Sequence, residues 1–151
     1  MALDPQSVEA LSLSATALTA RVLDQMTDAA TADIASAEGL VGPALAASPR
    51  SPLAHYAKGN VLRAQNQHEE AIPEYETAIA FNRNWVSAIH ALGQCKFYIG
   101  SIEETIPLEE QAIRLSPRDP FIGGAEANGL LLERDRLLDR SDVELALAKS
   151  V

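Results

Sequence analysis

Three histidines are the side chains of this sequence best suited to acid–base or metal chemistry: His55, His68 and His90. No two of them lie three or four residues apart with a third ligand nearby, which is the spacing that a helical metal site needs. We expect His55 to pack within a helix and His68 to be solvated at a turn. For His90, expected on the inner face of a stack of helices, contact with a partner and plain solvation stay equally open. The sequence therefore predicts no metal site.

Cys95 is the only cysteine, which excludes an intrachain disulfide and a multi-cysteine metal site. Lys96 beside it would lower the pKa of an exposed thiol, but a small residue packed between helices is the favoured interpretation. The acidic pair Glu69–Glu70 suits the first turn of a helix, where the helix dipole is positive. The glycines form no phosphate-binding motif, and the serines near the N-terminus lack a triad context. We therefore expect no catalytic residue, no cofactor and no enzyme activity.

Composition narrows the class of protein further. The 151 residues carry a net charge of −9, which opposes the phosphate-neutralising surface that nucleic-acid binding needs. Aromatic residues make up only 5%, and abundant alanine in their place favours closely packed helices. No apolar run is long enough for a membrane span, and Met1–Pro5 starts no signal peptide. We expect a cytoplasmic protein that binds neither nucleic acid nor membrane.

The chain repeats itself at an offset of 34 residues. When 52–85 is laid over 86–119 without a gap, ten pairs are identical, whereas about two are expected by chance. The identical pairs are Ala54/Ala88, Ala57/Ala91, Gly59/Gly93, Glu69/Glu103, Glu70/Glu104, Ile72/Ile106, Pro73/Pro107, Glu76/Glu110, Ala78/Ala112 and Ile79/Ile113.

Each repeat is expected to form two helices joined by a short turn. In the clearest repeat the first helix covers Leu53–Gln65 and the second ends near Phe81, with apolar residues at helical spacing. Pro73 falls just beyond the first turn of the second helix, where a slight bend is expected. A glycine in mid-helix costs about 1 kcal/mol relative to alanine, so the repeated Gly59 and Gly93 indicate close approach of two helices.

We expect a single domain over 1–151 with about four helix pairs. The predicted repeats are 7–51 with an insertion near 24–32, 52–85, 86–119, and a degenerate repeat or cap over 120–151.

A helix–turn–helix unit of 34 residues with this pattern resembles the tetratricopeptide repeat (TPR). The matching residues are Gly59, Ala71, Tyr75, Leu92, Gly93 and Pro117. The resemblance implies an all-α fold in which antiparallel helix pairs stack as a right-handed α-solenoid. Lys96 and Glu109 depart from it, because they stand where the family has aromatic residues. We expect Phe97, Tyr98 and Leu108 to replace the missing packing.

The phrase Arg114–Phe121 and the long first repeat resemble TPR regions attached to bacterial class III adenylate or guanylate cyclases and to winged-helix regulators. Asp4–Pro5 is similar to the end of a preceding repeat. The resemblance implies a longer signalling or regulatory parent protein.

The resemblance also places a candidate partner-binding site. First helices line the concave side of TPR proteins, and residues three or four apart share one stripe of a helix. The stripe could bind a peptide backbone and a carboxylate, although an ordinary wetted surface is the alternative. The predicted partner-binding residues are Tyr56, Asn60, Arg63, His90, Gln94 and Phe97.

We therefore expect a non-catalytic protein–protein interaction module that binds a peptide or helix of a partner, or another domain of its parent chain. The alternative is a self-associating structural or spacer segment of a cyclase-like or transcription-regulator parent. A homodimer would then bury apolar faces near Leu3, Leu11 and Leu130–Leu132 against a second copy.

Overall fold

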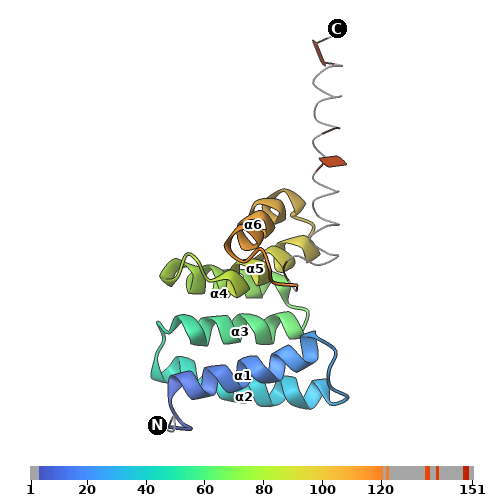
Figure 1. Ribbon diagram of the computed structural model, residues 1–151. Coiled ribbons are helices and arrows are strands. Elements are labelled where there is room, and N and C mark those ends of the chain that lie inside the picture. Colours follow the sequence, from blue (N-terminus) through green and yellow to red (C-terminus); the bar gives the residue numbers. More distant parts are fainter. Residues whose placement is uncertain (1–3, 121, 123–134, 137–138, 140–147, 150–151) are drawn as a thin grey trace.

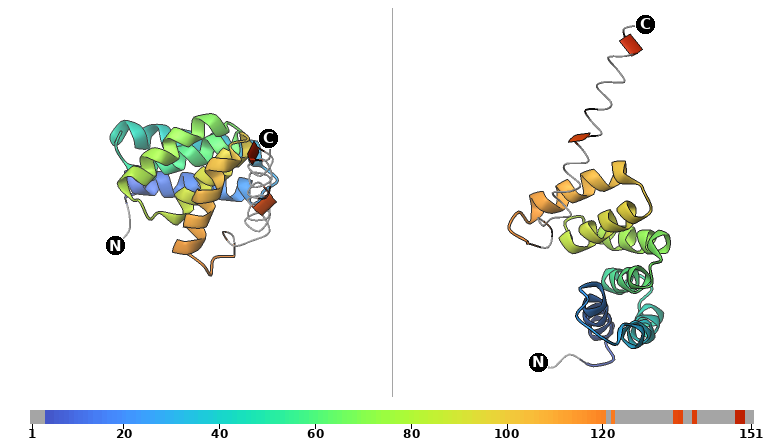
Figure 2. Two further views of the ribbon diagram at one scale, coloured as in Figure 1. Left: turned by 90° about the horizontal axis from the view of Figure 1, so that it is seen from above. Right: turned by 90° about the vertical axis from the view of Figure 1, so that its right-hand side faces the viewer.

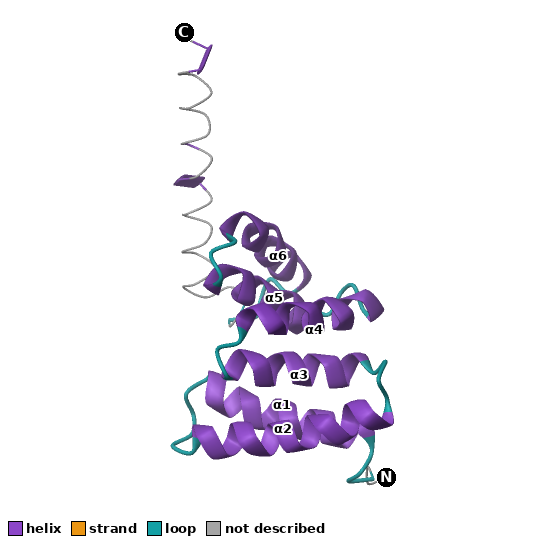
Figure 3. Ribbon diagram, turned by 180° about the vertical axis from the view of Figure 1, so that it is seen from behind, coloured by secondary structure: helices purple, strands orange, loops and turns teal. Residues whose placement is uncertain are grey.

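The computed structural model describes residues 4–120, 122, 135, 136, 139, 148 and 149. Within residues 4–120 it contains helices and no strand (Figure 3), as the sequence predicts. The helices are α1 (Val8–Leu23), α2 (Ala30–Ala47), α3 (Pro52–Ala64), α4 (His68–Phe81), α5 (Val86–Tyr98) and α6 (Ile102–Leu115). The fourth helix pair, expected over 120–151, falls almost entirely outside the described residues.

The six helices form three pairs that stack in chain order (Figure 1), and Figure 2 shows the stack from above and from the side. Each helix packs against its partner, and neighbouring pairs meet where α1 and α2 pack on α3 and where α4 packs on α5. The first helices are not equally close to one another. Helix α1 packs tightly along α3, whereas α3 and α5 barely touch.

All three turns within the pairs contain a residue in the left-handed backbone region: Gln25, Asn66 and Gly100. At each turn the residue after the left-handed one donates its backbone N–H to the carbonyl five residues earlier, as in the Ser101 to Lys96 hydrogen bond of 2.9 Å. This is the Schellman ending of a helix, which favours glycine or asparagine at the left-handed position. The equivalent positions Asn66 and Gly100 supply these two residue types, while Gln25 adopts the same conformation with a larger side chain.

The first repeat is longer than the others because both of its helices and their connection are longer. Helices α1 and α2 have 16 and 18 residues, whereas α3 and α4 have 13 and 14. The connection 24–29 also exceeds the three-residue turn at 65–67.

Local sequence signals explain where the helices begin. The side chains of Ser7 and Ser51 cap α1 and α3 by accepting hydrogen bonds from backbone N–H groups three residues later. The predicted acidic pairs do lie in the first turns of α4 and α6, where the helix dipole favours them. Pro73 and Pro107 lie inside α4 and α6 without ending either helix.

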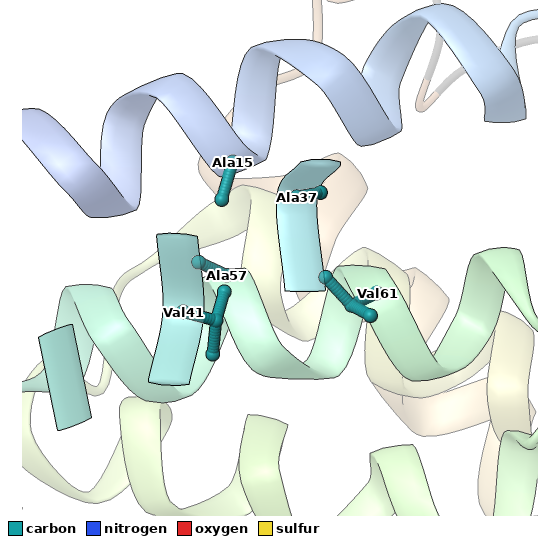
Figure 4. Packing of buried hydrophobic residues seen from close by; sticks show 5 residues of the cluster. All are labelled: Ala15, Ala37, Val41, Ala57 and Val61. Atoms are coloured by element: carbon teal, nitrogen blue, oxygen red, sulfur yellow. The ribbon is translucent and has the colours of Figure 1, made fainter. Parts of the chain in front are cut away.

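The core between the pairs consists largely of alanine. Figure 4 shows Ala15, Ala37, Val41, Ala57 and Val61 meeting between α1, α2 and α3, and the three alanines are fully buried. Small side chains allow the helix backbones to approach closely.

Leu11 belongs to this interior and not to an exposed end face. It is buried with Ala44 and Ala54, so the apolar face expected there for self-association is already covered within the chain. Leu3 and Leu130–Leu132 lie outside the described residues. None of the helices in the described part of the chain is long and apolar enough to span a membrane.

Candidate functional site: a groove along the first helices

A groove of about 580 Å³ runs along the first helices of the three pairs. Its walls come from the second half of α1, from α3, from α5 and from the segment that follows α6. The lining residues are Thr16, Ala20, Leu23, Asp24, Tyr56, Asn60, Arg63, Ser87, His90, Gln94, Asp119, Pro120 and Ile122.

Five of the six residues predicted to bind a partner line this groove: Tyr56, Asn60, Arg63, His90 and Gln94. Phe97 is not among the lining residues. Its ring meets Tyr98 edge-on, with centroids 5.7 Å apart, and 44% of the residue is exposed.

Contacts with two other aromatic rings hold Tyr56 in the groove wall. Its ring lies 4.6 Å from the Trp85 ring and 5.8 Å from the Tyr75 ring, measured between centroids. Because α3 and α5 barely touch, the contact of Tyr56 with Trp85, the residue that precedes α5, joins α3 to the start of α5. Trp85 is the only tryptophan in the sequence, so its fluorescence reports on this wall.

In the second repeat, Tyr75 of α4 lies directly against Gly59 of α3. A Cβ atom at Gly59 would stand 2.8 Å from the Tyr75 ring, which explains the glycine. The Tyr75 hydroxyl donates a hydrogen bond of 2.7 Å to Oδ1 of Asn60. Asn60 therefore has a structural role as well as a place in the groove lining. Burial raises the pKa of Tyr75 above its usual range, and the charge of Arg63 opposes that rise.

In the third repeat, Glu109 occupies the position of Tyr75 and lies against Gly93. A Cβ atom at Gly93 would stand 2.5 Å from the carboxylate oxygen Oε1. The carboxylate is almost completely buried and accepts from Nδ1 of His90, at 2.9 and 3.1 Å from its two oxygens. A buried acid–imidazole pair thus stands where the second repeat has a tyrosine ring.

Phe97 and Tyr98 therefore do not replace the missing aromatic packing, contrary to the sequence-based expectation. Tyr98 is 62% exposed, and of the three residues expected to replace that packing only Leu108 packs against the core. Lys96, the other departure from the family pattern, forms an ion pair of 2.5 Å with Glu104 across α5 and α6.

A second histidine–glutamate pair joins the helices of the second repeat. Nδ1 of His55 lies 2.6 Å from Oε2 of Glu74, and Nε2 lies 2.8 Å from the carbonyl oxygen of Pro49. Lys58 also contacts the Glu74 carboxylate, at 3.0 Å. Both ring nitrogens of His55 are occupied, so this residue joins helices and has no nitrogen left for a ligand.

Arg63 carries positive charge into the groove. No carboxylate of the described residues forms an ion pair with it, although Asp24 and Asp119 line the same groove. Its field also reaches Cys95, where burial raises the thiol pKa to about 11 and Arg63 opposes that rise. Cys95 is fully buried, as the sequence suggests for a small residue packed between helices.

His68 is more enclosed than a solvated turn residue. Its ring stacks on Tyr98 with centroids 4.6 Å apart, and burial lowers its pKa, helped by the charge of Arg63. Nothing in the described part of the chain gathers three potential metal ligands of the His, Cys, Asp or Glu type.

The sequence-based prediction includes no residue of α1 and none of the segment after α6, although both line the groove. Ser87 could have been included, because it lies three residues before His90 on the same helical stripe. Asp119 and Ile122 had no such signal, since they follow the last described helix and reach the groove through the tertiary fold alone.

Comparison with known proteins agrees with this architecture. Residues 59–100 match the TPR repeat family, a stretch from the middle of α3 to the turn after α5. No curated protein matches the chain in sequence.

Solved structures of TPR proteins share the fold at low sequence identity. A TPR protein of Thermus thermophilus is 17% identical with a TM-score of 0.66, and the match covers 85% of this chain and 66% of that one. MamA of Desulfovibrio magneticus is 19% identical with a TM-score of 0.67, covering 95% and 75%. The second TPR domain of human RPAP3, solved with the HSP70 peptide SGPTIEEVD, is 14% identical with a TM-score of 0.61, covering 82% and 98%.

The chain therefore has the fold of TPR proteins, an all-α stack of antiparallel helix pairs, and residues 59–100 carry the sequence pattern of the TPR repeat. It spans about two thirds of the length of the Thermus thermophilus protein, 66%.

Proposed function

We propose that this protein is a non-catalytic interaction module that binds a peptide segment of a partner protein in the groove along α1, α3 and α5. One observation carries the proposal: five side chains predicted to bind a partner, from two different repeats, line the same groove. TPR domains generally mediate protein–protein interactions, and the RPAP3 domain with the same fold was solved with a bound peptide.

The groove chemistry supports a polar peptide segment as the ligand. Arg63 offers a cation that can bind a carboxylate or carbonyl oxygen, while Asp24 offers an acceptor in the same groove. Tyr56 adds an aromatic surface held by its neighbours. A peptide that carries both donors and acceptors suits this mixed lining better than a purely acidic or purely apolar one.

The sequence phrase Arg114–Phe121 supports a further proposal, that the segment acts within a longer signalling or regulatory protein of the cytoplasm, next to a cyclase or winged-helix domain. Self-association into a homodimer is the alternative use of the same fold, and it has lost the face expected at Leu11.

Occluding the groove tests the proposal. Ser87 lines the groove and is exposed, so Ser87→Trp adds bulk there without removing an internal contact. Ser36→Trp is the matched control, because Ser36 is exposed on α2 away from the groove lining. Peptides are selected on the wild-type protein from a phage-displayed library of random sequence, and their binding is measured by fluorescence anisotropy.

We expect Ser87→Trp to weaken binding of the selected peptides at least tenfold and Ser36→Trp to leave it unchanged. A second pair, Arg63→Ala and Arg83→Ala, compares a groove arginine with an exposed arginine outside the lining. Peptides that bind all four variants equally, or a library that yields no binder, would contradict the groove proposal. Light scattering of the wild-type protein over a wide concentration range tests the homodimer.

A further inference from the structure

The two histidine–glutamate pairs differ in how many ring nitrogens they use. His55 and Glu74 are 19 residues apart, and so are His90 and Glu109. His55 engages both nitrogens, one with Glu74 and one with the Pro49 carbonyl. His90 engages only Nδ1, and its Nε2 has no hydrogen-bond partner among the described residues. His90 is also the member of the two pairs that lines the groove.

A carboxylate can only accept hydrogen bonds, so the Nδ1 atom that faces it must carry the proton. In the neutral imidazole one nitrogen is a donor and the other is an acceptor. With the proton held on Nδ1 by Glu109, the lone pair lies on Nε2. The nitrogen left for the groove is then a hydrogen-bond acceptor.

We propose that Glu109 is a positioning residue of the groove: it holds His90 in the Nδ1–H form, so that Nε2 accepts a hydrogen bond from a main-chain N–H of an extended peptide. This inference rests on the proposed function and names the chemistry by which the same groove recognises its partner. Arg63 on α3 supplies the complementary donor for a peptide carbonyl or carboxylate. An extended peptide offers both groups at every residue except proline.

The surroundings of Glu109 keep its carboxylate in place. The residue is 2% exposed, and the Gly93 surface lies so close that a single added Cβ would overlap Oε1. The carboxylate therefore lies between the α5 backbone at Gly93 and the His90 imidazole, and these contacts position it against Nδ1. Gly59 makes room for the Tyr75 ring in the second repeat, and the equivalent Gly93 makes room for the Glu109 carboxylate in the third.

Protonation of Nε2 would convert the proposed acceptor into a donor and remove its match to a peptide N–H. Besides Glu109 on α6, the ionisable groups that share the groove with His90 are Arg63 and Tyr56 on α3, Asp24 after α1, and Asp119 after α6. The protonation state of Nε2 therefore decides whether His90 can accept a hydrogen bond from a peptide N–H.

The first test reads the proton directly. Long-range proton–nitrogen correlation spectra of ¹⁵N-histidine-labelled protein, recorded from pH 9 downward, distinguish a protonated from an unprotonated ring nitrogen. We expect His90 to show an unprotonated Nε2 at the alkaline end. A proton on Nε2 there, with either a neutral or a charged ring, would overturn the assignment.

The variant Glu109→Gln sharpens this test, because a carboxamide can donate to Nδ1 as well as accept from it. We expect the Nε2–H form of His90 to become populated in Glu109→Gln. The matched control Glu74→Gln alters the His55 pair and should leave the His90 signals unchanged. Should Glu109→Gln fail to fold, the wild-type spectrum still decides.

The second test uses the peptides selected from the random library. Each main-chain N–H of a selected peptide is removed in turn by N-methylation, and binding is measured by anisotropy. We expect one methylated position to lose at least tenfold in affinity for the wild type and clearly less for Glu109→Gln. A flat methylation scan, or an equal loss on both proteins, would overturn the inference even if Ser87→Trp blocks binding. If no peptide depends on the groove, the proposed function fails, and the spectra still judge the His90 proton by themselves.

Discussion

The second and third repeats place different side chains against the same mid-helix glycine. In the second repeat a tyrosine ring covers Gly59, and its hydroxyl hydrogen bonds to Asn60 at 2.7 Å. In the third repeat a buried carboxylate covers Gly93 and pairs with His90 at 2.9 Å. The glycine fixes the close approach of the two helices, and the residue opposite it decides what holds them together.

The difference shows how a repeat protein can change one layer without losing the stack. A buried ring stabilises mainly through apolar contact. A buried acid–imidazole pair loses its hydration, and only its hydrogen bonds offset that free-energy cost. The third repeat accepts that cost at a histidine that lines the groove. The residue opposite the glycine is thus a packed ring in the second repeat, whereas in the third it holds a histidine that lines the groove.

Truncating the residue opposite the glycine is the largest expected effect. Tyr75→Ala removes a fully buried ring and should cost about 3–5 kcal/mol of unfolding free energy. Glu109→Ala should cost less, about 1.5–3 kcal/mol, because the lost interaction is a hydrogen bond to a charged group. Urea denaturation followed by circular dichroism measures both. The exposed Tyr98→Ala serves as control, and a larger loss for Glu109→Ala than for Tyr75→Ala would reverse the comparison.

Adding a methyl group to each glycine gives the next largest effect. Gly59→Ala presses against a rigid ring at 2.8 Å, and overpacking of this kind costs about 1–3 kcal/mol. Gly93→Ala meets the end of a glutamate side chain, which can shift at the expense of its hydrogen bond to His90. In both variants the better helix propensity of alanine returns about 1 kcal/mol.

We therefore expect Gly59→Ala to be clearly destabilised and Gly93→Ala to be less affected in urea denaturation. In Gly93→Ala the His90 tautomer signals should change, which no change at Gly59 should produce. Equal destabilisation of the two variants with unchanged His90 signals would show that the carboxylate is as rigidly held as the ring.

A smaller effect is expected at Cys95, whose equivalent in the second repeat is Val61. Both side chains are buried in the core, so Cys95→Val should change stability by less than about 1.5 kcal/mol. Burial and a thiol pKa of about 11 should make Cys95 unreactive toward Ellman's reagent at pH 8 in the folded protein. Reaction should become complete in urea. Rapid labelling of the folded protein would show that the core around α5 opens readily.

The sequence predicts much of this architecture because the repeat offset carries physical information. Helix α4 ends at Phe81, where the pattern puts its end, and the all-α stack of helix pairs is confirmed. The close approach predicted at Gly59 and Gly93 is confirmed as well. That prediction is possible because a glycine in mid-helix weakens the helix. Its repetition at the same position therefore indicates that the missing side chain makes room for a neighbouring helix.

The pairings across helices were not predictable in the same way. Glu109 comes 19 residues after His90 on a different helix, and only the packing of α5 on α6 brings them together. His55 and Glu74 have the same separation, but each lies one position earlier in its repeat than His90 and Glu109, so their surroundings differ. Phe97 shows the converse case, because helical spacing places it on the groove stripe, whereas in the structure it is not among the lining residues and its ring meets Tyr98.

The smallest expected effect concerns His68, which has Ile102 as its equivalent in the third repeat. Burial, helped by Arg63, lowers the pKa of His68 below its usual value of 6.5. The unfolded chain therefore binds this proton more readily, so the free energy of unfolding should fall as the pH drops below about 6.5. His68→Gln and the wild type both retain His55 and His90, so the difference between their pH profiles isolates His68. We expect urea midpoints of the wild type to decrease slightly more than those of His68→Gln between pH 7.5 and pH 5.5. Parallel profiles would mean that the stacked ring of His68 is as well solvated as a free histidine. The second repeat would then respond to pH at this position no more than the third repeat does with Ile102.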